Sequence, residues 1–309
     1  MRRLFLAGAV AGTLFLAGCD LDVIADSERY TEDFHHTYPL KPGGRVAIEN
    51  FNGSVEISGW SENSIQINGT KYAATREMLA GIKIDISAAA DSISIRTIRP
   101  SVRRGNMGAK YYIKVPRQVE LDRITSSNGA IRASDLEGPA HLKTTNGSVR
   151  GMNLHGDLDV QTTNGGIEVQ VLEGSAVLKT TNGRIRADEI QGSVDATTSN
   201  GGIHVRMAKS SSGRPTRLQT TNGGVELALE TPVQDNIEVS TSNGGITLRL
   251  PDKLGARVDA TTSNSSITTD FDVQAQGEIT KRRLQGTIGA GGPSIQLSTT
   301  NGSIRLLKL

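Results

Sequence analysis

The sequence predicts an all-β protein, a parallel β-solenoid (β-helix) of about 18-residue coils with an irregular N-terminal capping region. Three observations support this prediction. The dipeptide Asn-Gly recurs every 18 residues from Asn128 to Asn200 and at longer spacings after that, apolar and polar residues alternate between the repeats, and aromatic residues make up only 4% of the chain. A short constant period indicates a solenoid, and alternation indicates strands. A chain so poor in aromatic residues must build its core from aliphatic side chains.

One asparagine occupies the same position in every repeat, and a pair of Thr or Ser residues precedes it. Asn and Gly both tolerate a positive φ, so we expect the dipeptide to form a corner of each coil. Asparagine side chains in successive coils can hydrogen-bond to one another as an amide ladder. The sequence therefore predicts a structural turn ladder, which consists of Asn128, Asn146, Asn164, Asn182, Asn200, Asn222, Asn243, Asn264 and Asn301.

Each repeat holds two short alternating segments, separated by a second glycine near its middle, such as Gly156. Strand, turn, strand and corner then make one coil, and about ten coils at 4.8 Å per strand give a rod about 45–50 Å long. The alternation places Thr144 on the inward face with Leu142, and Thr145 on the outward face. Asn-Gly also favours antiparallel hairpins, but the constant spacing favours the solenoid.

The first 18 residues have the features of a lipoprotein signal peptide. Arg2 and Arg3 precede an apolar run at residues 4–16, which is too short to span a membrane. The sequence LAGC at residues 16–19 resembles the bacterial lipobox, in which the cysteine carries fatty acyl chains. We expect Cys19, the only cysteine, to be the lipid attachment site that holds the chain at a membrane. The alternative is an ordinary secretory signal with an incidental cysteine.

The rest of the chain divides into three parts. Residues 19–40 are polar and unpatterned, which is typical of a tether. Residues 41–125 form the irregular N-terminal β region of the solenoid, interrupted by a helix-permissive stretch at 73–80, and should cap the stack. Residues 126–309 carry the regular repeats. The long gap between Asn264 and Asn301 predicts a coil with an insertion.

Several segments resemble one bacterial family. They are RVAIENFNGSVEISGW at 45–60, the repeated TTNGSV and TSNGGI, YIKVP at 112–116 and GGPSIQLSTTNGSIRL at 291–306. These segments are similar to the "putative adhesin" β-strand-repeat family of unknown function. The resemblance covers almost all of the chain after the signal peptide. It implies a β-solenoid outside the cytoplasm, with no established enzymatic activity.

The sequence offers no catalytic or metal-binding constellation. A threonine nucleophile needs a base beside it, yet no His or Lys recurs with the Thr pairs, and the five histidines have no metal-ligand spacing. Asp157, Asp159, Glu168 and Glu173 are replaced by basic residues in neighbouring repeats, which indicates a mixed, solvated surface. The repeats lack the Asp of calcium-binding turns, and one outward Thr row is too narrow for ice binding. We therefore expect no cofactor and no enzymatic activity.

The charge is nearly balanced, with a net of +2, which argues against a nucleic-acid partner. We therefore interpret the chain as a non-enzymatic binding scaffold of the cell envelope, lipid-anchored to a membrane and facing the periplasm or the exterior. Its expected partners are that membrane and an envelope glycan or protein. Two alternatives remain, an envelope-stress sensing or regulatory lipoprotein and a carbohydrate-active β-helix enzyme.

Overall fold

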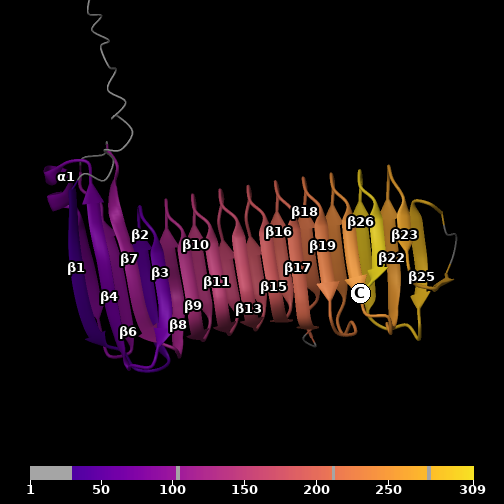
Figure 1. The fold of residues 1–309 in the computed structure, drawn as a ribbon, viewed down its shortest axis with the longest axis horizontal. Coiled ribbons are helices and arrows are strands. Elements are labelled where there is room, and N and C mark those ends of the chain that lie inside the picture. The colour runs from indigo at the N-terminus through magenta and orange to yellow at the C-terminus, as the bar shows by residue number, and fades with distance from the viewer. Residues whose placement is uncertain (1–29, 102–104, 211–212, 277–279) are drawn as a thin grey trace, which may run out of the picture.

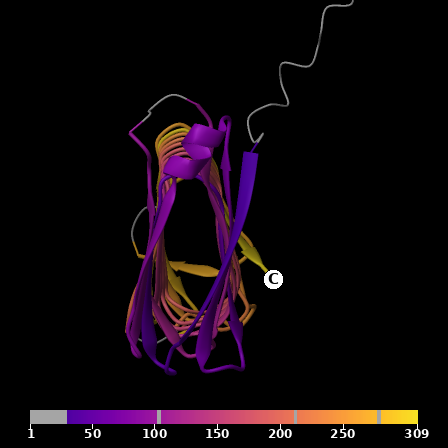
Figure 2. The same cartoon turned by 90° about the vertical axis from the view of Figure 1, so that its left-hand side faces the viewer.

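The structure is a computed structural model that describes residues 30–101, 105–210, 213–276 and 280–309. The predicted signal peptide, Cys19 and residues 20–29 of the predicted tether lie outside the described residues. The described chain forms one short helix, α1 (Arg76–Gly81), and two long sheets. The sheets are the two opposite walls of a flat, elongated stack (Figure 1), and α1 lies over one edge at one end of it (Figure 2).

We call the 13-stranded sheet sheet A and the 14-stranded sheet sheet B. In stacking order, sheet A consists of β1 (Tyr30–Pro39), β4 (Ser64–Ala73), β7 (Met107–Pro116), β3 (Val55–Trp60), β9 (Ile131–Glu137), β11 (Val149–His155), β13 (Ile167–Glu173), β15 (Ile185–Gly192), β17 (Ile203–Ser210), β19 (Val225–Leu229), β21 (Ile246–Leu250), β27 (Ile304–Lys308) and β23 (Ile267–Thr269).

Sheet B runs along the opposite wall. From the same end, it consists of β5 (Lys83–Ala88), β6 (Ser92–Ile98), β2 (Gly44–Asn50), β8 (Val119–Ser126), β10 (Ala140–Thr144), β12 (Leu158–Gln161), β14 (Ala176–Lys179), β16 (Val194–Thr198), β18 (Thr216–Thr220), β20 (Ile237–Thr241), β26 (Ser294–Thr299), β22 (Ala256–Thr262), β25 (Arg283–Ile288) and β24 (Val273–Ala275).

Each regular coil contributes one strand to each sheet. Equivalent residues of successive coils pair in parallel, for example Val149 with Ile167 in sheet A and Leu142 with Val160 in sheet B. The constant spacing in the sequence is thus the length of one coil. The predicted parallel β-solenoid is confirmed, and the antiparallel-hairpin alternative is wrong for the repeats.

The core consists of columns of like aliphatic side chains between the two sheets. Each fully buried side chain of this size stabilises the fold by roughly 1.5–3 kcal/mol. Each coil has only two facing strands, one in each sheet. Branched aliphatic side chains are long enough to fill the space between the two sheets, so few aromatic residues are needed. The central column of sheet A contains Ile131, Val149, Ile167, Ile185, Ile203, Val225, Ile246 and Ile304, each at most 2% exposed.

The inward threonines are buried next to this core and are all hydrogen-bonded in the same way. Thr144 is only 3% exposed, and its hydroxyl donates a hydrogen bond to the carbonyl of Gly129 in the preceding coil, at 2.9 Å. Thr162 repeats the bond to Gly147, also at 2.9 Å. The bond satisfies a buried hydroxyl and a corner carbonyl together, so the inward threonine of each pair ties neighbouring coils to each other.

The corner glycine is required for a different reason from the one the sequence suggests. None of the asparagines and glycines of the described corners from Asn128 onward has a positive φ. Instead, a Cβ atom on Gly183 would lie 2.0 Å from the carbonyl oxygen of Gly165, and Gly147 and Gly201 meet the same obstacle. The backbones of successive coils touch at the corner, and only glycine permits this approach.

Left-handed backbone occurs at a second column, on the other side of the coil. Asp135, Asn153, Val171 and Glu189 have φ between 52° and 58°, at one-coil intervals. Each is followed three residues later by one of the mid-coil glycines, whose φ values are also positive. Asn and Asp adopt this conformation readily, whereas a β-branched valine is strained there.

The stacking order departs from the sequence order at the N-terminal end. The coil of β2 and β3 lies inside the stack, between the coil of β6 and β7 and the coil of β8 and β9. The antiparallel strands β1, β4 and β5 complete this end of the sheets. Residues 30–39 therefore form a strand and not the tether that the sequence predicts. The helix α1 overlaps the helix-permissive stretch at 73–80 and extends one residue beyond it.

The C-terminal end shows the same departure. The last coil, β26 and β27, lies between the coil of β20 and β21 and the coil of β22 and β23. Figure 1 accordingly shows the C terminus inside the row of strands and not at its end. The long gap between Asn264 and Asn301 holds β24 and β25, which pair antiparallel at the end of sheet B. These residues close the stack and do not interrupt a coil, contrary to the expected insertion.

We expect the corner glycines to tolerate no side chain. Gly183→Ala should lower the free energy of unfolding by about 3 kcal/mol, because its Cβ atom overlaps a backbone carbonyl that cannot move away. Gly202→Ala, whose Cβ atom would lie 3.3 Å from the nearest atom, is the matched control and should stay within about 0.5 kcal/mol of the wild type. Urea unfolding followed by circular dichroism measures both. Equal losses in the two variants would contradict the corner contact.

We also expect Val171→Asn to stabilise the fold by about 1 kcal/mol, because it relieves a β-branched residue from left-handed backbone. Asn153 already adopts this conformation and donates to Asp135 at 2.8 Å, so the new amide enters an existing row. Val177→Asn is the control, because Val177 is similarly half-buried in the strand β14 and has no positive φ. The same unfolding assay should show no gain for it, and a gain in both variants would refute this explanation.

Candidate functional site

The asparagines predicted to form the turn ladder lie in one exposed row along the corner. Asn146 donates its amide to the side-chain oxygen of Asn128 at 2.7 Å, and the same bond recurs from coil to coil. At the C-terminal end the row follows the stack and not the sequence, because Asn301 donates to Asn243 and Asn264 donates to Asn301. Between the ends of the row, each amide donates one hydrogen bond and accepts one, so the row ties the corners of successive coils to one another.

The outward face of sheet A carries the most varied side chains of the regular coils. Two columns point outward from its strands. The first column contains, in stacking order, Tyr112, Glu56, Arg132, Arg150, Glu168, Arg186, His204, Glu226, Thr247 and Arg305. The second column begins Lys114, Ser58, Ser134, Met152.

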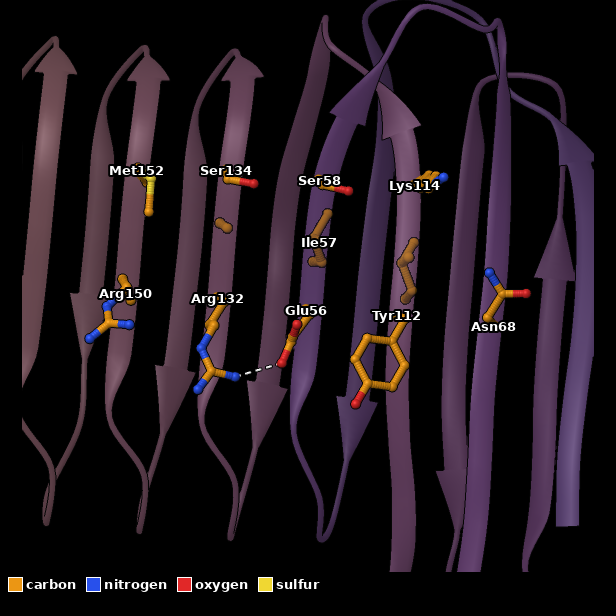
Figure 3. Close-up of a pocket in the computed structure, with 12 residues that line it drawn as sticks. Glu56, Ile57, Ser58, Asn68, Tyr112, Lys114, Arg132, Ser134, Arg150 and Met152 are labelled. Carbon is orange, nitrogen blue, oxygen red and sulfur yellow. Dashed lines mark hydrogen bonds and ion pairs between the residues drawn. The ribbon is translucent and has the colours of Figure 1, made fainter.

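A depression of about 310 Å³ lies where these two columns start (Figure 3). Tyr112 borders it on one side and Met152 on the other, with Ser58 and Ser134 between Lys114 and Met152. The two serines are short where the flanking strands carry long side chains, and this difference in length makes the hollow. We call it the Tyr112 depression.

The Tyr112 depression holds an unusual amount of exposed apolar surface. Among the described residues, four large hydrophobic side chains are exposed, and Tyr112 and Met152, at 49% and 44%, are two of them. Exposed apolar groups gathered in one hollow are typical of a binding site, whereas scattered ones are ordinary. A tyrosine ring and a thioether both offer adaptable contacts to the flat or apolar part of a ligand.

Charged side chains border the same hollow. Arg132 pairs with Glu56 across adjacent strands, and Arg150 pairs with Glu168 at 2.6 Å. Both arginine side chains are about half exposed, at 48% and 49%, and each is paired with a carboxylate. Further along the first column, Arg186 donates a hydrogen bond to the Asp188 carboxylate, and this bond raises the pKa of Arg186, which therefore stays charged. Tyr112 and Met152 lie at opposite sides of the hollow, and the Glu56–Arg132 pair and the two serines lie between them.

The described residues around the depression contain no paired nucleophile and base. No histidine lines it, and the buried Tyr111 next to Tyr112 lies beneath the sheet, where its hydroxyl is 2.6 Å from the hydroxyl of Thr97. Burial raises the pKa of Tyr111 to about 12, so it stays protonated at neutral pH. Within the described ranges, no group of three or more His, Cys, Asp or Glu side chains is placed to hold a metal ion.

Sequence reasoning predicted the corner row but did not identify the Tyr112 depression. The signal in the sequence is weak. In strand β7 the alternation points Tyr111 inward and Tyr112 outward, so an aromatic residue occupies a position that is otherwise polar. The depression also needs Ser134 and Met152 from coils that the chain reaches later, and no local pattern joins them.

The family model described as Toastrack DUF4097 matches residues 45–234 and 210–307. The chain belongs to the Toastrack DUF4097 family. The match covers the irregular first coils as well as the regular repeats, so the out-of-order N-terminal end is part of the family's domain. No curated protein matches the chain.

Among solved structures, a putative adhesin from Parabacteroides distasonis is 12% identical to this Toastrack chain, with 89% of this chain and 97% of that one covered and a TM-score of 0.50. At this identity the likeness concerns the fold alone. A putative adhesin from Bacteroides fragilis is also 12% identical, with 90% and 97% covered and a TM-score of 0.42. A putative lipid binding protein from Parabacteroides distasonis is 12% identical, with 90% and 96% covered and a TM-score of 0.40.

No helix within the described ranges is long and apolar enough to cross a membrane.

Proposed function

We propose that this protein is a non-enzymatic, lipid-anchored, adhesin-like scaffold of the cell envelope, which binds its partner through the outward face of sheet A. The observation that carries the proposal is the Tyr112 depression, which has two of the four large hydrophobic side chains exposed among the described residues on its opposite sides and the cations Lys114, Arg132 and Arg150 in its lining. The Toastrack fold supports it, because a solved protein of similar fold is described as a putative adhesin.

The architecture suits a scaffold. Each coil is held by its neighbours on both sides, so side chains on the outward columns are fixed at strand spacing without a loop or lid. A rigid, flat face loses little conformational entropy when it binds. The lipid on Cys19 would keep this face at a membrane surface, which is where an adhesin meets its partner.

Replacing the two apolar side chains of the depression should abolish attachment. We expect the double variant Tyr112→Ser, Met152→Ser to lower the retention of protein-coated beads on isolated cell envelopes at least about tenfold, because exposed aromatic anchors carry most binding energy. Ile98→Ser is the control, since Ile98 is 41% exposed on sheet B. Unchanged retention in the double variant would contradict the role of this face. Release of reducing ends from envelope polysaccharide by the wild type would contradict the non-enzymatic assignment.

The predicted lipid anchor has its own test. Cys19→Ala should move the protein from the membrane fraction to the soluble fraction, because without acyl chains nothing holds the domain at the bilayer. Fractionation followed by immunoblotting measures the shift, with Ser27→Ala, in the same N-terminal segment, as the control. A membrane fraction that stays constant in Cys19→Ala would refute lipid anchoring through this residue.

A further inference from the structure

A second hollow on sheet A lies over a row of bare backbone. Between each corner glycine and the next buried aliphatic residue stands one residue of the outward face. In three consecutive coils this residue is Gly202, Gly224 and Gly245. These glycines are the floor of a groove of about 470 Å³, which we call the glycine groove.

The fold does not require glycine in this row. A Cβ atom on Gly202 would lie 3.3 Å from its nearest neighbour, whereas one on the corner residue Gly201 would lie 2.0 Å from a carbonyl oxygen. Equivalent positions in other coils carry Ser148, Gly166, Arg184 and Ser303. Stacking therefore does not demand glycine in this row, and only the groove has three glycines in successive coils.

The walls of the groove are polar and cationic at its two ends. Arg184 stands in the glycine row itself, one coil before Gly202, and Arg305 stands in the first outward column, one coil beyond Gly245. Both side chains are exposed, and neither forms an ion pair with any described residue. Four coil steps of about 4.8 Å separate the two strands, so the backbones that carry Arg184 and Arg305 lie about 19 Å apart along the stack.

The acidic group inside the groove is already neutralised. Glu226 contacts His204 at 3.2 Å and Arg249 at 3.3 Å. Arg186 is another cation beside Arg184, but it forms an ion pair with Asp188. The middle of the groove therefore offers hydrogen-bonding groups, including the hydroxyl of Thr247, and the two ends offer free positive charge.

This arrangement excludes two kinds of linear ligand. A peptide that adds as a strand needs unpaired backbone groups, but the amides of Ile203, Val225 and Ile246 already donate to the next coil. Single-stranded nucleic acid is held by a series of aromatic platforms for successive bases, and the groove offers none from Phe, Tyr or Trp and a single imidazole, His204, which is paired with Glu226. A chain of sugar rings needs neither, because hydroxyl groups can lie on bare backbone and bond to polar walls.

We infer that the glycine groove binds an extended acidic glycan, with its carboxylates on Arg184 and Arg305 and its sugar rings over Gly202, Gly224 and Gly245. The inference rests on the proposed function, because it names a ligand class for the same face of the scaffold. It assigns that ligand to a site separate from the Tyr112 depression, and guanidinium groups suit carboxylates because they donate two parallel hydrogen bonds.

The test measures binding of polygalacturonate to the purified full chain in detergent, with the carboxyl-reduced polymer and poly-glutamate as comparison ligands. The double variant Arg184→Gln, Arg305→Gln should weaken polygalacturonate binding at least tenfold. Gly224→Gln should weaken it as much by filling the floor without changing charge, since Arg184 shows that the row accepts a long side chain. The control Lys143→Gln, Arg257→Gln removes two exposed charges from sheet B and should leave the affinity unchanged.

Circular dichroism and thermal unfolding first establish that each variant is folded. Binding of polygalacturonate without binding of the reduced polymer or poly-glutamate supports the inference. Equal binding of poly-glutamate shows a general polyanion site and overturns it, as does polygalacturonate binding that the groove variants leave unchanged. If the wild type binds envelopes but no polygalacturonate, the groove assignment fails and the proposed function stands. If it binds neither, both fail.

Discussion

The close contact between backbones at the corner is the constraint on which the rest of the structure depends. A Cβ atom on most corner glycines would lie about 2 Å from the carbonyl of the coil before it, so the coils can approach only where that atom is missing. Once the corners touch, strands on both walls fall into register, the inward threonines reach the corner carbonyls, and the asparagine amides reach one another. Each of these bonds is modest on its own. Together they stabilise the stack, because every coil forms the same bonds at equivalent positions.

This repetition explains why so much of the fold can be predicted from the sequence. Every coil makes the same contacts, so the position of Asn146 predicts the positions of Asn164 and Asn182. The alternation around Val149 predicts which side chains face the core. Features that do not repeat were not predictable in this way. The corner glycine is required by a contact between neighbouring coils. Conformational propensity describes single residues, so it does not predict this contact. The strand β1 is exposed along an edge and lacks a marked apolar alternation, so its sequence resembles a tether.

The stacking order and the candidate sites share another difficulty, because both depend on which coils become neighbours. Asn301 lies between Asn243 and Asn264 although it comes last in the chain. The Tyr112 depression joins β7, β3, β9 and β11, and no sequence period relates the first two of these strands to the others. The glycine groove is easier to recognise from the sequence, because its three floor residues are the second glycines of three Asn-Gly-Gly repeats. Their significance appears only when the structure shows that the first glycine is compulsory and the second is not.

The position of the last coil inside the stack has a consequence for how the protein is made. A chain that emerges from the ribosome or a translocation channel with its N-terminus first cannot assemble these coils in the order in which they appear. Residues 256–288 are synthesised before the coil that separates them from β20 and β21. The edges of β20 and β22 therefore stay unpaired until β26 has been synthesised. Open parallel edges are the surfaces through which β proteins aggregate. The stack is therefore complete only when β26 and β27 lie between their two neighbouring coils, and a variant that lacks residues 294–308 lacks the coil that joins the end cap to the rest of the solenoid.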